Sequence, residues 1–251
     1  MIPLAQSSRY TENQILAALD KAAYQRFFSQ LERVSLSLGE LIYEAEGTIN
    51  HVYFPDTAVF SMLAMMEDGR TVEVGPIGNE GLAGLRVALG SNITPERVIV
   101  HIPGTAWRLK QAALKDELVS GRTTLSHNLI RYTRMLLTMT ARTSACNKLH
   151  TLEQQLARWL LTMNDYVGDE LRLTHDLMAL TLGVRRAGVS VAANGFRSSG
   201  VIDYRRSDIH VIDRKGLEAL ACECYQAVRE EYESLYADLS AGVRLYDGAG
   251  P

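Results

Sequence analysis

The chain has 251 residues, of which 47% are hydrophobic and 22% are charged, and its formal net charge is −3 at pH 7. This composition is ordinary for a globular protein, and no apolar run approaches the roughly 20 residues that a membrane-spanning helix needs. A basic-then-apolar secretory signal is missing, and the three cysteines form no paired framework. We therefore expect a cytoplasmic protein that contacts no membrane.

The first part of the chain changes its pattern from helical to strand-like. Apolar residues recur at helical spacing over residues 11–32, which predicts one helix. Residues 34–109 contain short apolar or alternating runs separated by glycine and proline, and Asp68-Gly69 between two such runs indicates a hairpin. Residues 1–116 are therefore predicted to form an antiparallel, jelly-roll-like β-roll.

A long helical pattern follows from residue 111 to residue 149. Within it, seven residues step by four and three: Leu125, Leu129, Tyr132, Leu136, Met139, Thr143 and Cys146. A heptad seam sustained for about three heptads is typical of a helix that pairs with another helix. We interpret residues 117–149 as a dimerisation helix with these seven residues at the interface. The alternative is an ordinary amphipathic helix that packs on its own roll.

Residues 150–251 begin with a helix that ends near Gly168 and continue into a helix-turn-helix pattern at 173–190. The hydroxyl of Thr174 can cap the first helix of this motif. Ala179 is small enough for a close helix crossing, and Gly183 suits the positive φ of a tight turn. Val189 then supplies an apolar contact from the second helix.

A two-stranded wing is predicted directly after this motif. Gly200 ends the second helix, residues 201–204 and 209–212 form two strands, and residues 205–208 form the turn between them. A last helical pattern covers about 214–241. The predicted fold class is therefore α+β, with an N-terminal β-roll, a long helix and a C-terminal winged helix-turn-helix domain over 150–251.

The charge is distributed unevenly along the chain. Residues 171–215 contain eight basic and four acidic residues, whereas the chain as a whole is negative. A basic module on an acidic body is typical of a protein that contacts double-stranded DNA with one end.

This order of elements resembles that of the Crp/Fnr superfamily of bacterial transcription regulators. The motifs that carry the resemblance lie at residues 39–44, 51–55, 67–70, 78–84, 173–174, 179, 182–186, 189–190, 200–202 and 209–213. The resemblance implies a homodimer that binds dyad-symmetric DNA sites and contacts RNA polymerase. It also implies that an effector acts on DNA affinity through the β-roll.

Candidate DNA contacts are assigned from the position of the second helix, about 185–197. Side chains near the start of that helix reach base edges, and arginine bound to guanine is the commonest specific contact. The predicted base contacts are Arg186, Ser190, Ala187 and Val191. The predicted phosphate contacts are Thr174, Arg185, Arg197, Arg205 and Arg206.

The β-roll departs from the pattern of the cyclic-nucleotide readers that it resembles. Its candidate ligand residues are Gly81, Leu82, Gly84, Arg97 and Val98. Leu82 stands where those readers have a carboxylate for the ribose, and Val98 stands where they have a hydroxyl for the phosphate. We therefore expect an unidentified small-molecule effector, if one exists, and not cyclic AMP. The glycines of 78–84 either hold an anion through their amides or are turn glycines.

The remaining residues suggest neither a cofactor nor catalysis. Residues 1–145 lack cysteine, which argues against the iron–sulfur sensors of the family. His51 and His101 are possible haem ligands, but we expect them to be structural. The Cys222-Glu223-Cys224 pair is either a redox or metal switch or two thiols on different faces of one helix, and we expect the second.

We therefore expect no metal and no enzymatic activity, since the six histidines show neither H-x-H nor H-E-x-x-H spacing. The alternative to a DNA-binding regulator is a signalling or assembly protein whose helix-turn-helix does not read DNA.

Overall fold

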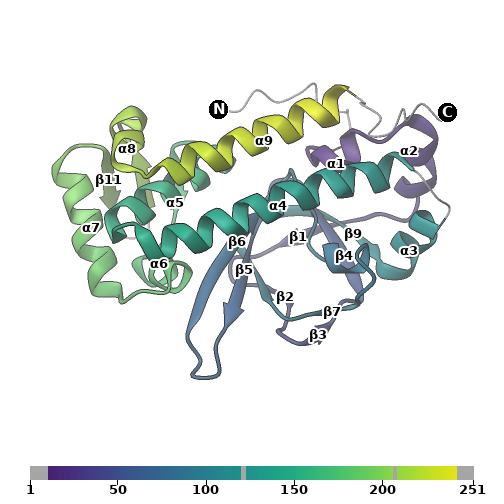
Figure 1. The fold of residues 1–251 in the computed structure, drawn as a ribbon, viewed down its shortest axis with the longest axis horizontal. Helices are drawn as coiled ribbons and strands as arrows, with labels where there is room; N and C mark the ends of the chain where they lie inside the picture. The colour runs from purple at the N-terminus through teal and green to yellow at the C-terminus, as the bar shows by residue number, and fades with distance from the viewer. Residues whose placement is uncertain (1–10, 120–122, 206–207, 242–251) are drawn as a thin grey trace, which may run out of the picture. The chain divides into compact units, whose positions relative to one another are not determined.

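The computed structural model describes residues 11–119, 123–205 and 208–241 (Figure 1). It confirms the predicted fold class, because antiparallel sheets are followed by a long helix and a winged helix-turn-helix. Packing divides the described chain into two units. One combines residues 61–76 with 138–230, and the other combines 4–60, 77–137 and 231–251, of which 4–10 and 242–251 lie outside the described residues.

The β-roll contains three antiparallel groups of strands. The first sheet has the order β1 (Glu32–Leu36), β9 (Gly104–Lys110), β4 (His51–Pro55). The second has the order β2 (Leu41–Tyr43), β8 (Arg97–Ile102), β5 (Val59–Met65), β6 (Thr71–Ile77), and β3 (Gly47–Thr48) pairs with β7 (Ile93–Thr94). A short 3-10 turn, η1, covers Leu85–Val87. The predicted hairpin joins β5 to β6, with Gly69 at φ +82°.

The helix predicted over residues 11–32 is two helices, α1 (Gln14–Ala17) and α2 (Lys21–Phe28). Each has its own side-chain cap: Oδ1 of Asn13 accepts from the backbone N–H of Leu16, and the Asp20 carboxylate accepts from that of Ala23. Asp20 stabilises the start of a new helix at Lys21, so the chain forms two helices here. The apolar residues keep their helical spacing across the break, which is why the sequence predicted one helix.

The rest of the chain is mostly helical. The pattern predicted from residue 111 to residue 149 is divided between α3 (Gln111–Val119) and α4 (Thr124–Leu149). They are followed by α5 (Leu152–Val167), α6 (His175–Leu182), α7 (Arg186–Ser198), α8 (Arg214–Leu220) and α9 (Glu223–Ala241). Among the described residues, no helix is long and apolar enough to cross a membrane.

The seam predicted on α4 packs against this chain's own core. Leu136 is half-buried, and the other six residues are between 0% and 6% exposed within a single chain: Leu125, Leu129, Tyr132, Met139, Thr143 and Cys146. Side chains buried in this way cannot also face a partner, so the predicted assignment of this seam to a dimer interface is wrong. The exposed large apolar residues of α4 are Ile130, Leu137 and Leu149.

Candidate nucleic-acid interface

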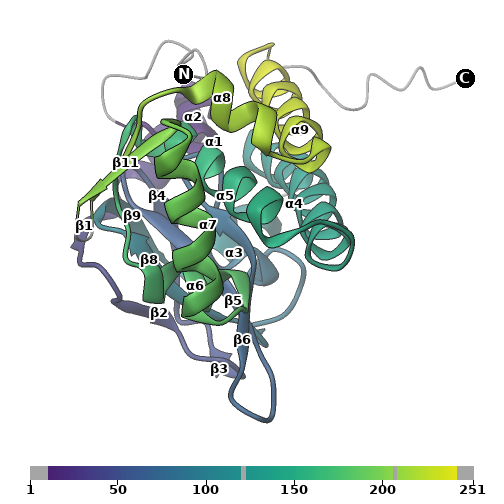
Figure 2. The same cartoon turned by 90° about the vertical axis from the view of Figure 1, so that its left-hand side faces the viewer.

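Helices α6 and α7 and the turn between them form the predicted helix-turn-helix (Figure 2). Thr174 caps α6, since its hydroxyl oxygen accepts from the backbone N–H of Leu177 at 3.1 Å. Gly183 ends α6 in the left-handed conformation, at φ +65°. Ala179 and Val189 are 7% and 0% exposed, as expected for the helix contact. The local signals in the sequence therefore predicted this motif correctly.

Helix α5 packs against α7. A Cβ atom added to Gly188 of α7 would lie 2.8 Å from Cδ2 of Leu152, so glycine allows a close approach at this point. Trp159 and Leu160 in α5 are at most 1% exposed. This packing leaves the opposite face of α7 free for solvent.

The wing has three strands rather than the predicted two. Strand β11 (Ile202–Arg205) pairs with β12 (Asp208–Val211), and β10 (Glu170–Arg172) pairs with the other edge of β12. A strand of three residues leaves too short an alternation to be detected in a sequence. Arg206, a predicted phosphate contact, lies outside the described residues, and so does the side chain of Arg205.

The exposed face of α7 carries most of the predicted DNA contacts. Arg185, Arg186, Ala187, Val191 and Arg197 are all exposed, as is Thr174 at the start of α6. Sequence reasoning missed Asn194, which is also exposed on α7. It lies four residues after Ser190 and three after Val191, and this helical spacing was the available signal.

Two arginines on this face have acidic neighbours. Arg186 Nε lies 3.3 Å from Asp176 Oδ1, with the two side chains 66% and 72% exposed. Arg197 Nε lies 3.4 Å from Asp203 Oδ1. Exposed pairs of this kind contribute about 0–1 kcal/mol, so a nucleic acid can displace the carboxylates at little cost.

Ser190 points toward the protein rather than away from it. Its hydroxyl is hydrogen-bonded to Nδ1 of His175 at 2.9 Å, and the His175 ring stacks on Tyr204 with ring centroids 4.6 Å apart. Burial lowers the pKa of His175, and the nearby charge of Arg186 lowers it further. The neutral ring thus joins α6, α7 and β11.

The ligand candidates in the β-roll are packed by aromatic and apolar side chains. Leu82 and Val98 are 1% and 3% exposed. A Cβ atom on Gly81 would lie 2.5 Å from Oη of Tyr132, and one on Gly84 would lie 2.8 Å from Oη of Tyr43. This close packing favours the interpretation of Gly81 and Gly84 as turn glycines.

Arg97, the predicted anion contact, already has a carboxylate partner. Its Nε and Nη2 donate to the two carboxylate oxygens of Glu44 at 2.8 and 2.7 Å. An anionic ligand would have to displace this bidentate pair. Ligand binding at these residues stays a prediction.

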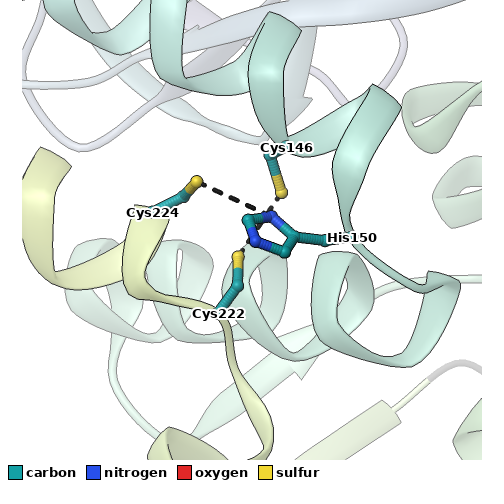
Figure 3. Close-up of side chains that lie close together, drawn as sticks. All are labelled: Cys146, His150, Cys222 and Cys224. Atoms are coloured by element: carbon teal, nitrogen blue, oxygen red, sulfur yellow. Dashed lines mark hydrogen bonds between the residues drawn. The ribbon is translucent and has the colours of Figure 1, made fainter.

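The three cysteines meet, together with a histidine that the sequence analysis did not connect with them. The ligand-type atoms of Cys146, His150, Cys222 and Cys224 all lie within 4.8 Å of one another (Figure 3). Cys222 lies just before α9 and Cys224 lies in its first turn, so the prediction that they occupy different faces of one helix is wrong. The available signal was the spacing of Cys146 and His150, because residues four apart share a helix face.

Comparison with known proteins agrees with this description. Residues 154–220 match the family model of the Crp-like helix-turn-helix domain. No curated protein matches the chain.

Solved structures of the same fold come from several bacteria. FixK2 from Bradyrhizobium japonicum is 18% identical, with 76% of this chain and 98% of that chain covered and a TM-score of 0.66. A Crp/Fnr-family regulator from Eubacterium rectale is 15% identical, with 80% and 94% covered and a TM-score of 0.64. The regulator TTHA1359 from Thermus thermophilus is 21% identical, with 76% and 98% covered and a TM-score of 0.60. The fold that the resemblance to the Crp/Fnr superfamily implies is therefore confirmed, and the matching family model covers the helix-turn-helix domain.

Proposed function

We propose that this chain is a DNA-binding regulator of the Crp/Fnr superfamily, that it works as a homodimer, and that its DNA affinity responds to a signal at the β-roll. The match to the Crp-like helix-turn-helix model and the shared fold support this proposal. The observation that carries the proposal is the exposed face of α7, which presents arginine and small apolar side chains while the opposite face packs on α5. The proposed domains are the roll (1–116), the α4 region (117–149) and the DNA-binding domain (150–251).

On DNA, α7 would lie in the major groove, with its start directed at the bases. Arg186 would donate two hydrogen bonds to a guanine, while Ala187 and Val191 would contact thymine methyl groups. Ser190 would reach a base only by giving up its hydrogen bond to His175. Thr174, Arg185, Arg197, Arg205 and Arg206 would bind phosphates and position the helix.

The dimer would form through the exposed face of α4 rather than through its buried seam. Ile130 and Leu137 are 56% and 65% exposed, and they lie seven residues apart. Ala141 and Ser144 continue this exposed row in steps of four and three. Such a row matches the heptad period of paired helices. In a symmetric dimer, the two copies of α7 would enter successive major grooves about 34 Å apart.

The β-roll lacks two of the polar side chains with which the cyclic-nucleotide readers of this superfamily bind their effector. With leucine at position 82 and valine at position 98, a ribose hydroxyl and a phosphate would each lose a polar partner. We expect an effector other than cyclic AMP. We also propose that the protein is cytoplasmic and contacts RNA polymerase there.

Selection from DNA with randomised half-sites tests the proposed function. Wild-type protein should select a dyad-symmetric sequence. The Arg186→Ala variant should bind that site with about 1–3 kcal/mol less free energy and lose its preference at one position of each half-site. Arg206→Ala should weaken binding to all sequences alike and reduce the salt dependence.

Arg26→Ala is the matched control, because Arg26 is an exposed arginine of α2 that should leave selection unchanged. If the wild-type protein selects no sequence and shows no salt-dependent DNA binding, the signalling or assembly alternative replaces this proposal.

A further inference from the structure

We propose that Cys146, His150, Cys222 and Cys224 form a closed structural zinc site at the base of the DNA-binding domain. All four residues belong to the same packing unit, which contains residues 138–230. They come from two places in that unit: the end of α4 and the connection from α8 into α9. The site goes beyond the proposed regulatory function and does not depend on it.

The distances between the donor atoms fit one tetrahedral ion. With zinc–sulfur bonds of about 2.3 Å, the sulfur atoms of a tetrahedral site lie about 3.8 Å apart. In the structure, the Sγ atoms of Cys146 and Cys222 are 3.5 Å apart, and Sγ of Cys224 is 3.8 Å from Nδ1 of His150. No separation in the group exceeds 4.8 Å, so a small inward movement of the side chains would bring all four donor atoms to bonding distance of one ion. An iron–sulfur cluster places several atoms between its ligands and needs a wider arrangement.

His150 is already oriented for this role. Its Nδ1 lies 3.8 Å from Sγ of Cys224 (Figure 3). Its Nε2 lies 3.2 Å from Oε2 of Glu223. Histidines that bind zinc usually donate their other ring N–H to a carboxylate or carbonyl group, which fixes the tautomer and the ring orientation. Glu223 therefore acts as the partner that presents Nδ1 to the metal. The side chain of Gln155 also donates to the carbonyl oxygen of His150 at 2.9 Å, which holds the backbone at this point.

Burial and charge favour a structural rather than a catalytic metal. Cys146, Cys222 and Cys224 are 0%, 5% and 2% exposed, and four protein ligands leave no open coordination position. Three thiolates, one neutral imidazole and Zn²⁺ carry a net charge of −1. The buried guanidinium of Arg158 in α5 lies beside Cys146 and would balance that charge.

The connectivity gives the metal a clear structural effect. Cys146 and Cys222 are 76 positions apart, and the whole helix-turn-helix and wing lie between the two ligand pairs. A metal bound to both pairs would join the two segments that flank the helix-turn-helix and wing. Since unfolded chains rarely hold such a site intact, metal binding adds to folding stability.

Metal analysis of the full chain tests the site. Protein purified without chelator from zinc-containing medium should carry about one zinc per chain, and zinc removal should lower the melting temperature. Titration of the metal-free protein with Co²⁺ alone should give the intense thiolate-to-cobalt charge-transfer bands and the strong visible bands of a tetrahedral sulfur-rich site.

Variants of two of the ligands and of Glu223 test whether the zinc binds at the named residues. Cys224→Ser and His150→Ala should lose the stoichiometric zinc. Glu223→Ala should keep one zinc per chain but bind it about tenfold more weakly in competition with a chelator. His127→Ala is the matched control, because His127 lies on α4 outside the group and its removal should not change the zinc content. If Cys224→Ser does not fold, His150→Ala and Glu223→Ala still carry the test.

Three results would each overturn the proposal. The first is wild-type protein that takes up neither zinc nor Co²⁺ while all three thiols are reduced. The second is iron with acid-labile sulfide in place of zinc. The third is a stoichiometric zinc that the His150→Ala and Cys224→Ser variants both retain.

Discussion

Replacing Glu73 with glutamine tests how a buried carboxyl group affects the stability of the DNA-binding unit. Glu73 lies on β6 and is 5% exposed, and one of its oxygens accepts a hydrogen bond from Nε1 of Trp159 in α5 at 3.1 Å. The hydroxyl of Ser61 donates a hydrogen bond to the other carboxylate oxygen of Glu73. Burial raises the pKa of Glu73 to about 7, although these two hydrogen bonds and the charge of Arg158 act in the opposite direction. This group connects the β5–β6 hairpin to the helix that supports α7.

The direction of the pH effect follows from where the proton is bound. Between the ordinary glutamate pKa of 4.5 and about 7, the folded protein keeps the proton and the unfolded chain loses it. The free energy of unfolding contributed by Glu73 therefore falls as the pH rises through this window and levels off above it. The shift corresponds to about 3 kcal/mol over the whole window, of which about 2 kcal/mol falls between about pH 5 and about pH 8.

Urea unfolding of wild type and Glu73→Gln at these two pH values measures the effect. Glutamine keeps an oxygen that accepts a hydrogen bond from Trp159, but it does not ionise. The free energy of unfolding of the Glu73→Gln variant relative to wild type should therefore increase from the lower to the higher pH. Glu170→Gln is the control, since Glu170 is exposed and its removal should leave the wild-type slope. A constant difference between wild type and Glu73→Gln at both pH values would show that Glu73 ionises normally in the folded protein.

Three further predictions concern α4, the helix-turn-helix and the effector. Leu137→Glu should convert dimers to monomers in sedimentation experiments, whereas Val119→Glu, at an exposed apolar position of α3, should not. Gly183→Ala should destabilise the protein by about 1–2 kcal/mol in urea, because φ is +65° there, whereas Gly195→Ala in α7 should stabilise it by roughly 0.5–1 kcal/mol. Calorimetry should detect no cyclic AMP binding at micromolar concentrations, and tight binding would contradict our reasoning about the roll.

The helix-turn-helix could be predicted because its causes are local. Thr174 caps a helix that begins at the next residue, and Gly183 takes a conformation that few other residues tolerate. These preferences act over a few positions and leave a pattern in the sequence. The third strand of the wing could not be predicted in this way, since β10 depends on pairing with β12 about 38 positions later along the chain.

The cysteine–histidine group could be predicted only in part. Cys146 and His150 share a helix face, and Cys222 and Cys224 lie two residues apart, so each pair could be identified as a half-site. Nothing in a single sequence indicates that two such pairs meet, because their distance depends on how α5 and α8 pack between them. The hydrogen bond of Ser190, a predicted base contact, could not be anticipated for the same reason, because its hydroxyl turns toward a histidine 15 positions away.

The two faces of α4 show what a periodic pattern can and cannot establish. The seam from Leu125 to Cys146 has the period of a helix–helix contact, and the structure gives that period a partner inside the chain: Tyr132 packs on Gly81, and Met139 packs on Gly75. A periodic pattern indicates which residues are buried on the same face of a helix. It does not indicate whether that face packs on the same chain or on a second copy. The row that begins with Ile130 and Leu137 is weaker as a pattern, yet it remains exposed in the single chain. In a regulator that pairs through this helix, the contact with the second copy must use the face that the first copy leaves uncovered, so the weaker pattern is the better candidate for the dimer interface.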